Sequence, residues 1–287
     1  MNEVNEEIGR TIDVDGIATN YHDSGEGYPV LLVHGSGPGV SAWANWRLTI
    51  PALAKQFRVL APDVLGFGYT DRPRGIRYDT TNWSRHLIGF LDALKVERIA
   101  VVGNSFGGGL ALRLAIEHPD RVHKLVLMGS VGVRFPITPA LDAVWGYRPS
   151  VARMRSLLDV FAHDRRLVSD ELAELRYQAS ARPGVQEAYA AMFPAPRQRA
   201  LDALSLSEER IRTIGHETLV IHGRDDEVIP LSASERLERL IDRAQLHVFG
   251  HCGHWVQIEH SDRFNRLVAE FLSEPLPSGF EPNIQPQ

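Results

Sequence analysis

The sequence predicts an α/β protein with a mostly parallel central sheet flanked by helices. From Tyr28 onward, short apolar runs rich in β-branched residues alternate with helical patterns. These runs are apolar throughout, which is typical of strands in a parallel sheet that helices cover on both faces. The chain has 287 residues, 44% of them hydrophobic, and can therefore bury a full core.

The expected strands follow one another in chain order. The six runs are "YPVLLVHG", "FRVLAPD", "RIAVVGNS", "VHKLVLMGS", "TLVIHGRDD" and "AQLHVFGHCGH". After the fourth run the alternation stops, and residues 131–207 carry helical patterns and several prolines but no strand pattern. A helical insert between two late strands is typical of a lid over the carboxyl edge of the sheet, where open α/β sheets bind ligands.

The same pattern predicts the domain organisation. We expect one core domain built from residues 8–130 and 208–272, with residues 131–207 as the helical lid. An independent helical domain is the weaker alternative, because strands of the same character resume after the insert. Residues 1–7 and the proline-rich 273–287 are expected to be flexible termini.

Composition and charge exclude several classes of partner. The formal net charge is −5, and basic and acidic residues are mixed, so there is neither a basic stripe for nucleic acid nor a cationic amphipathic helix for a membrane surface. The first ten residues are acidic rather than basic and apolar, and no apolar run reaches membrane-spanning length, so we expect a cytoplasmic protein. The single cysteine, Cys252, fits a reducing compartment, and a lone cysteine is more often a packing residue than a nucleophile.

A candidate nucleophile lies at the end of the third run. Gly103, Asn104, Ser105, Phe106 and Gly107 match the pattern G-x-S-x-G, preceded by a strand pattern and followed by an apolar helix. Strand, sharp turn and helix are the context that a nucleophile elbow requires, and small neighbours permit the strained turn. We therefore predict a nucleophilic serine at this turn, although a glycine-rich turn that holds a serine by accident remains the alternative.

A serine nucleophile needs a neutral histidine as base and an acid that orients the histidine. On an α/β-hydrolase sheet the acid and then the histidine follow the serine in the chain, each in a loop just after a strand. The run "TLVIHG" leads into Asp225 and Asp226, and "AQLHVFG" leads into His251 and His254. These four residues are the candidates for acid and base.

Other histidines near these loops have simpler interpretations. His247 lies within the last expected strand and His260 within the following helix, so both are expected to be packing or surface residues. A zinc site from His251, Cys252 and His254 matches no common ligand spacing and lacks a distant partner cluster. We therefore expect no metal.

Acyl transfer also needs N–H donors that stabilise an oxyanion, usually one after the nucleophile and one in the turn after an early strand. Phe106 supplies the first, and Ser36 in the turn "VHGSGPG" is the expected second donor, while His34 is expected to support this turn. The turn is a poor nucleotide loop, because it lacks the third glycine of the dinucleotide fingerprint and the G-K-[ST] sequence. Pro38 also removes an N–H.

Five segments together resemble the meta-cleavage product hydrolases of aromatic degradation, and the resemblance extends from about residue 8 to residue 272. They are "HGSGPGVSAWANWR", "VGNSFGGG", "FPITPALDAVWGY", "HGRDDEVIP" and "LHVFGHCGHW". The resemblance implies the α/β-hydrolase fold with Ser105 as nucleophile, Asp226 as the acid and His254 as the base.

The resemblance also assigns substrate contacts. It implies that Asn45, Asn104, Arg176 and Trp255 hold the dienoate end of the substrate, although the stretch "ELRYQASARPG" also offers Arg182 as an alternative. The far end of the pocket is then expected to be walled by the lid and by three further residues, Val131, Val228 and Trp145.

The activity implied is hydrolysis of a carbon–carbon bond in 2-hydroxy-6-oxohexa-2,4-dienoates that carry hydrogen or a short alkyl as the acyl substituent. The family ketonises such substrates before cleavage and needs neither a metal nor an organic cofactor. The resemblance further suggests a homodimer or a larger homo-oligomer.

Two other functions remain open at this point. A carboxylesterase would use the same triad on an ester and would need no clamp for a carboxylate. A catalytically silent small-molecule receptor would keep the pocket and respond to ligand through its lid. Family members that open epoxides or handle halides resemble this fold with an aspartate at the elbow, and the serine here disfavours them.

Overall fold

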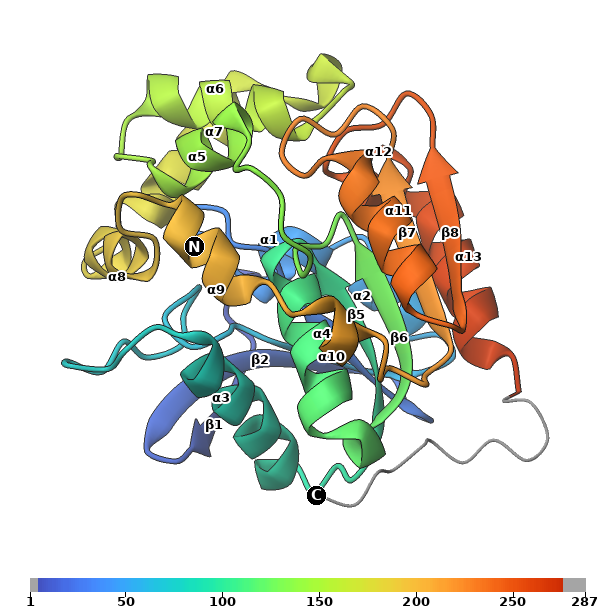
Figure 1. Ribbon diagram of the computed structural model, residues 1–287. Coiled ribbons are helices and arrows are strands. Elements are labelled where there is room, and N and C mark those ends of the chain that lie inside the picture. The colour runs from blue at the N-terminus through green and yellow to red at the C-terminus, as the bar shows by residue number, and fades with distance from the viewer. Residues whose placement is uncertain (1–4, 276–287) are drawn as a thin grey trace.

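The computed structural model describes residues 5–275 and has an eight-stranded sheet of order β1-β2-β4-β3-β5-β6-β7-β8 (Figure 1). The strands are β1 (Arg10–Val14), β2 (Ile17–Ser24), β3 (Pro29–Val33), β4 (Arg58–Pro62), β5 (Ile99–Asn104), β6 (Val122–Met128), β7 (Thr218–Gly223) and β8 (Ala244–Phe249). The six strands β4, β3, β5, β6, β7 and β8 are parallel to one another. Strand β2 pairs antiparallel with both β1 and β4. The six expected runs are β3 to β8, so the prediction of a mostly parallel sheet is confirmed.

The hairpin of β1 and β2 was absent from the expected strands. Its turn consists of Asp15 and Gly16, both with positive φ, 52° and 81°. Asp-Gly between two strands is a strong hairpin signal, because both central residues of such a turn need positive φ. The strands themselves are partly exposed and mix polar with apolar residues, so they lack the continuous apolar run that marks β3 to β8.

Helices cover both faces of the sheet. They are α1 (Ala42–Trp46), α2 (Ile50–Leu53), α3 (Thr80–Ala93), α4 (Phe106–Glu117), α5 (Pro139–Trp145), α6 (Val151–Phe161), α7 (Asp170–Ser180), α8 (Val185–Met192), α9 (Gln198–Leu204), α10 (Glu208–Ile211), α11 (Leu231–Leu240), α12 (Val256–Glu259) and α13 (Ser261–Ser273). Within residues 5–275 no helix is long and apolar enough to cross a membrane.

Alternate residues of each buried strand pack on opposite faces, as strand geometry requires. In β3, Leu31 and Val33 join a core cluster with side chains of α3, α4 and α11, whereas Val30 and Leu32 join a second cluster with side chains of α1, α2 and α13. Because both faces are buried, every core strand must be apolar at successive positions. This is the reason that the six runs were recognisable in the sequence.

The chain between β6 and β7 contains helices α5 to α10 and no strand. Figure 1 shows α5, α6 and α7 above the end of the sheet toward which β7 and β8 point. The helical insert therefore lies at the carboxyl edge of the sheet, where the loops that follow the strands meet. That residues 131–207 act as a lid stays a prediction.

Residues 5–7 make hydrogen bonds to strand β2 and to one another. The Nδ2 of Asn20 donates to the backbone oxygen of Glu7 at 3.0 Å, and the amide of Glu7 donates to the side chain of Asn5 at 3.0 Å. That residues 1–7 are flexible stays a prediction. Residues 1–4 lie outside the described residues.

At the C-terminal side, Ser273 is the last residue of α13, and the buried Nζ of Lys124 donates to the backbone oxygen of Glu274 at 2.5 Å. That residues 273–287 are flexible stays a prediction. Residues 276–287 lie outside the part of the chain that the structure describes.

A buried carboxylate connects three separate segments of the chain through hydrogen bonds. Asp63, fully buried after β4, accepts hydrogen bonds from Ala42 N at 2.6 Å, from Tyr69 N at 2.7 Å and from Asn20 Nδ2 at 2.8 Å. Burial raises the pKa of Asp63 to about 6, although these hydrogen bonds act in the opposite direction. Because Ala42 begins α1, this carboxylate also sets the position of the helix that carries Asn45.

Replacing this carboxylate tests its structural role. We expect Asp63→Ala to lower the free energy of unfolding by about 3 kcal/mol, because buried donors lose their acceptor. Urea denaturation measures the change, and Asp242→Ala, at an exposed aspartate, is the control with an expected change within about 0.5 kcal/mol. Equal stability of the two variants would contradict the role of Asp63.

Candidate active site

Ser105 occupies a strained turn between β5 and α4. Its backbone has φ 54° and ψ −116°, a region that residues with a side chain rarely adopt. A Cβ at Gly103 would lie 2.5 Å from the backbone oxygen of Gly107, and a Cβ at Gly107 would collide with the backbone oxygen of Val33. The strand, the sharp turn and the helix are all present, so the local structure expected of a nucleophile elbow is confirmed.

A histidine and an aspartate meet at the carboxyl ends of the last two strands. His254, after β8, has its Nδ1 at 2.7 Å from the Oδ2 of Asp226, which follows β7. The other carboxylate oxygen accepts the backbone N–H groups of Val228 at 2.7 Å and Ile229 at 3.0 Å. Burial alone would raise the pKa of Asp226, but the contact with His254 brings it below its usual value. A carboxylate at Nδ1 leaves Nε2 free to act as a base.

The structure separates the two adjacent aspartates that the spacing left equivalent. Asp225 donates its N–H to the backbone oxygen of Cys252 at 2.9 Å and accepts the amide of Cys252 at 3.3 Å. It therefore connects the loops after β7 and β8, while only Asp226 reaches His254. His251 is exposed and has a positive φ of 52°.

No group of three histidine, cysteine or acidic side chains is arranged to hold a metal ion within residues 5–275. The candidate zinc ligands separate as the chain turns. His254 points to Asp226, His251 is exposed, and Cys252 is buried, where desolvation raises the pKa of its thiol. His247 and His260 are partly buried residues with ring contacts to Phe249.

The turn after β3 is held by side chains on both sides. Both ring nitrogens of the buried His34 are engaged, since Nδ1 lies 2.7 Å from the oxygen of Gly35 and Nε2 lies 2.9 Å from the amide of Val64. Burial lowers the pKa of His34 to about 4, so the ring is neutral and supports the turn. Gly35 donates its N–H to Asn45 Oδ1 at 3.1 Å.

The two expected oxyanion donors lie at the positions that their motifs require. Phe106 is the first residue of α4, immediately after Ser105. Ser36 lines the same cavity as Ser105, and its backbone oxygen accepts the hydroxyl of Tyr189 at 2.8 Å. This contact anchors the turn to the helical insert. That the two N–H groups bind an oxyanion stays a prediction.

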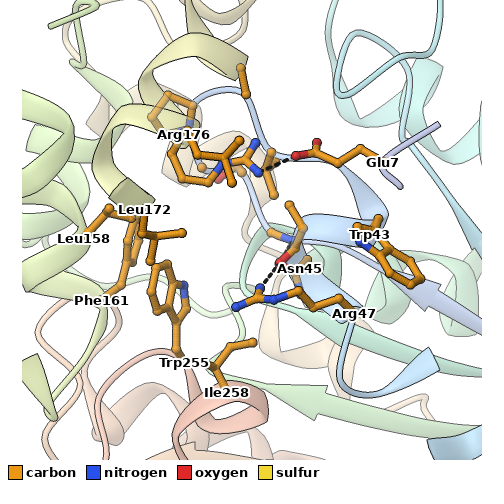
Figure 2. A pocket seen from close by; sticks show the side chains of 18 of the residues that line it. Glu7, Trp43, Asn45, Arg47, Leu158, Phe161, Leu172, Arg176, Trp255 and Ile258 are labelled. Atoms are coloured by element: carbon orange, nitrogen blue, oxygen red, sulfur yellow. Dashed lines mark hydrogen bonds and ion pairs between the residues drawn. The ribbon is translucent and has the colours of Figure 1, made fainter. Parts of the chain in front are cut away.

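The candidate nucleophile and the candidate base line one cavity of about 700 Å³. Ser105, His254, Asn45 and Asn104 all line it, together with charged and apolar side chains. Figure 2 shows Leu158, Phe161 and Trp255 on one side of the cavity and Asn45 and Arg47 on the opposite side. Such a division suits a ligand with one polar and one apolar end.

Arg176 lines the cavity with both terminal nitrogens engaged. Its Nη1 donates to Glu7 Oε1 at 2.6 Å and its Nη2 donates to the backbone oxygen of Gly39 at 2.7 Å (Figure 2). Glu7 also accepts the hydroxyl of Ser41 at 2.6 Å. The guanidinium is therefore already paired with a carboxylate from the N-terminal segment, a contact that the sequence did not suggest.

The alternative arginine, Arg182, lines the same cavity. Its Nη2 donates to the backbone oxygen of Gly68 at 2.7 Å, and its guanidinium lies 3.8 Å from the ring centroid of Tyr69. A third arginine, Arg47, was missed in the sequence although it follows Asn45 closely in "ANWR". Burial and the nearby positive charge of Arg176 lower the pKa of Arg47.

The two asparagines differ in their free hydrogen-bonding capacity. Asn104 donates through Nδ2 to the backbone oxygen of Met128 at 3.3 Å. Asn45 uses Oδ1 for Gly35, while its buried Nδ2 has no hydrogen-bond partner among residues 5–275. A buried donor without a partner is costly, so this group is available to a bound ligand.

Two of the three residues expected to wall the acyl end do not line the cavity. Val228 lines it, but Val131 is fully buried and donates its N–H to the backbone oxygen of Ser105 at 3.2 Å. Trp145 turns its indole toward Ser36 and donates to Oγ at 2.9 Å. Both residues therefore support the site from behind, and the expectation is corrected. Apolar residues of the insert line the cavity instead, among them Leu141, Val144, Met154, Leu158 and Phe161.

Comparison with known proteins agrees with this geometry. The family model of the alpha/beta hydrolase fold matches residues 28–261. The chain is 65% identical over 268 residues to 2-hydroxymuconate semialdehyde hydrolase of Pseudomonas sp. strain CF600, covering 93% of this chain and 95% of that protein. It is 63% identical over 273 residues to 2-hydroxy-6-oxo-2,4-heptadienoate hydrolase of Pseudomonas putida strain F1, covering 95% and 99%.

Among solved structures, a mutant of the meta-cleavage product hydrolase from Pseudomonas fluorescens IP01, complexed with acetates, superposes with a TM-score of 0.93. The two sequences are 62% identical, over 93% of this chain and 98% of that one. The chain therefore belongs to the alpha/beta hydrolase family and, within it, to the meta-cleavage product hydrolases.

The acid pair provides a direct test of the site. We expect Asp226→Asn to lower kcat by a factor on the order of 10⁴, because an amide no longer selects the histidine tautomer that can accept a proton from serine. Asp225→Asn is the matched variant and should cost far less, since Asp225 contacts Cys252, Arg224 and His163 but not His254. Steady-state kinetics on both variants measures the difference. Equal losses, or the reverse order, would contradict the assignment.

Proposed function

We propose that this chain hydrolyses a carbon–carbon bond in 2-hydroxy-6-oxohexa-2,4-dienoates and releases 2-hydroxypenta-2,4-dienoate with formate or a short carboxylate. One observation carries the proposal: a single cavity is lined by the elbow serine, by His254, which contacts Asp226, and by partly buried arginine and buried asparagine side chains. A triad alone would suffice for an ester. The arginine and asparagine side chains on one side of the cavity, called the polar wall below, add a proposed binding site for a carboxylate.

The proposed chemistry depends on where the electrons of the broken bond go. A carbanion is a poor leaving group unless conjugation accepts its charge. Ketonisation moves the proton of the 2-hydroxyl to C5 and leaves a 2-oxo group conjugated with the C3–C4 double bond. Cleavage of C5–C6 then sends the electron pair through the chain to the 2-oxygen, which a proton neutralises. The acceptor lies within the substrate, so the proposed reaction needs no metal or organic cofactor.

Each group in the site has a defined task in this reaction. Ser105, with His254 as its base, attacks the C6 carbonyl, and Asp226 keeps the imidazole oriented. After C5–C6 cleavage the acyl group remains on Ser105, and water hydrolyses this ester to release formate or the short carboxylate. The N–H groups of Ser36 and Phe106 stabilise the oxyanion that develops at C6. The strained turn at Ser105 and the 2.7 Å contact between His254 and Asp226 support these roles.

The dienoate end is proposed to lie against the polar wall. Arg176 binds the carboxylate, which replaces Glu7 on the guanidinium, and the unpartnered Nδ2 of Asn45 donates to the 2-oxygen. Asn104 lines the same cavity and binds this end of the substrate, while Trp255 contacts the dienoate from the opposite side of the cavity. A simple carboxylesterase would gain nothing from these groups, and a receptor would bind the dienoate without turnover.

Arg176 separates the proposed reaction from ester hydrolysis. We expect Arg176→Ala to lower kcat/KM for the dienoate about 100-fold, as loss of a buried charged hydrogen-bond partner implies. Hydrolysis of a neutral ester, which uses only the triad and the oxyanion donors, should change little. Arg182→Ala is the matched variant. Equal damage to both substrates would indicate a structural role, and an effect confined to Arg182→Ala would move the carboxylate to that residue.

The acyl substituent is proposed to be hydrogen or methyl. The names of the two relatives that are 65% and 63% identical specify an aldehyde and a methyl ketone. We expect both 2-hydroxymuconate semialdehyde and its 6-methyl analogue to be hydrolysed, because an apolar pocket discriminates one methylene by only about 10- to 200-fold. The 6-phenyl analogue should be at least roughly 100-fold slower.

Loss of the dienolate absorbance measures all three rates, with Ser105→Ala as the control without a nucleophile. Preference for the phenyl compound would contradict the proposed pocket. Inactivity toward all three, combined with turnover of simple esters, would favour the carboxylesterase.

A further inference from the structure

The segment that carries the base is attached to the helical insert. The amides of His254 and Trp255 both donate to the backbone oxygen of Phe161, at 2.8 and 3.2 Å. Phe161 is the last residue of α6, where helical carbonyls lack partners within the helix. Its ring also stacks on Trp255 with 5.2 Å between centroids. Residues 253–255, called the base segment below, therefore supply the hydrogen bonds that cap the C-terminal end of α6.

Glu259, the last residue of α12, makes a second connection between the same two segments. Its Oε1 accepts the N–H of Gly253 at 2.7 Å, and its Oε2 accepts the N–H of Asp164 at 2.8 Å. Gly253 immediately precedes His254, and Asp164 lies in the insert just after α6. Hydrogen bonds from an N–H to a carboxylate are among the stronger ones. One side chain thus joins the base segment to the insert.

The close approach of these segments also explains a glycine. A Cβ at Gly253 would lie 2.8 Å from both the oxygen of Phe161 and the amide nitrogen of His163. Such distances are too short for a side chain, so the contact requires glycine at this position. The backbone of the base segment is therefore packed directly against the backbone of the insert.

We propose that Glu259 is a positioning residue that makes the placement of His254 depend on the seated helical insert. The inference rests on the proposed roles of Ser105 and His254, but not on the identity of the substrate. When the insert occupies the observed position, Phe161 and Asp164 together hold the backbone of residues 253–255. Removal of these contacts lets the imidazole move, and a displacement of about 1 Å is enough to cost about 100-fold in rate.

Labelling with a small fluorophosphonate tests this role. The reagent phosphonylates an activated serine with loss of fluoride, so its rate reports on the triad without requiring a dienoate. Glu259→Gln replaces one acceptor by an NH₂ group, so one of the two backbone N–H groups loses its partner. We expect the labelling rate of Ser105 to fall about tenfold, as expected for the loss of a hydrogen bond to a charged group. Glu270→Gln, at an exposed position of α13, is the matched control and should label at the wild-type rate.

A substitution on the insert side distinguishes positioning from simple stabilisation of the base segment. Asp164→Pro removes the N–H that Glu259 accepts, and the φ of −82° at this residue suits proline. Asp164→Ala keeps the N–H and loses the same side chain. We expect Asp164→Pro to slow labelling as much as Glu259→Gln does, Asp164→Ala to stay within about twofold of wild type, and the double variant to be no slower than either single variant. Thermal unfolding of each variant shows that the labelled protein is folded.

The proposal is overturned if the Glu259→Gln variant is labelled at the wild-type rate. The proposal is also overturned if Glu259→Gln is labelled slowly while Asp164→Pro is labelled at the wild-type rate. Glu259 would then act on the base segment alone. A wild-type protein that resists the reagent would remove the proposed triad and this inference together. A wild-type protein that is labelled but leaves dienoates intact would remove only the proposed carbon–carbon cleavage.

Discussion

The hydrogen bond between Asp226 and His254 is the interaction on which the rest of the site depends. It is possible because β7 and β8 are neighbouring parallel strands in which Gly223 pairs with Phe249, so the loops after them leave the sheet side by side. Two backbone N–H groups fix the other carboxylate oxygen, at Val228 and Ile229. The acid is therefore held by the backbone, and the base takes its orientation from the acid.

The helical insert completes the site from the opposite side. Tyr189 and Trp145 bind Ser36 in the turn after β3, and Phe161 binds the segment that carries His254. These contacts hold the turn with the expected oxyanion donor and the base segment at the same time. The insert is therefore hydrogen-bonded both to the turn after β3 and to the segment that carries His254.

The polar wall shows how a short terminal segment takes part in a site. Glu7 pairs with Arg176, and the side chains of both are nearly buried, with exposed fractions of 12% and 13%. The guanidinium of Arg176 is therefore already bound to a carboxylate of the same chain. The sequence of this segment carries no strand or helix pattern, and hydrogen bonds from Asn20, Arg176 and Ser41 to Glu7 attach it to the rest of the chain. Assembly into dimers or larger oligomers remains a prediction.

Local sequence determined the parallel strands, the elbow at Ser105 and the helical character of the insert. Strands buried on both faces must be apolar at successive positions, and a strained turn with close backbone contacts must have glycines beside it. Only the tertiary structure decided between Asp225 and Asp226, placed Trp145 and Val131 behind the cavity, and brought Glu7 and Arg47 to its wall. Adjacent residues point in different directions, and side chains distant in the sequence meet only when the sheet is assembled. No local pattern carries that information.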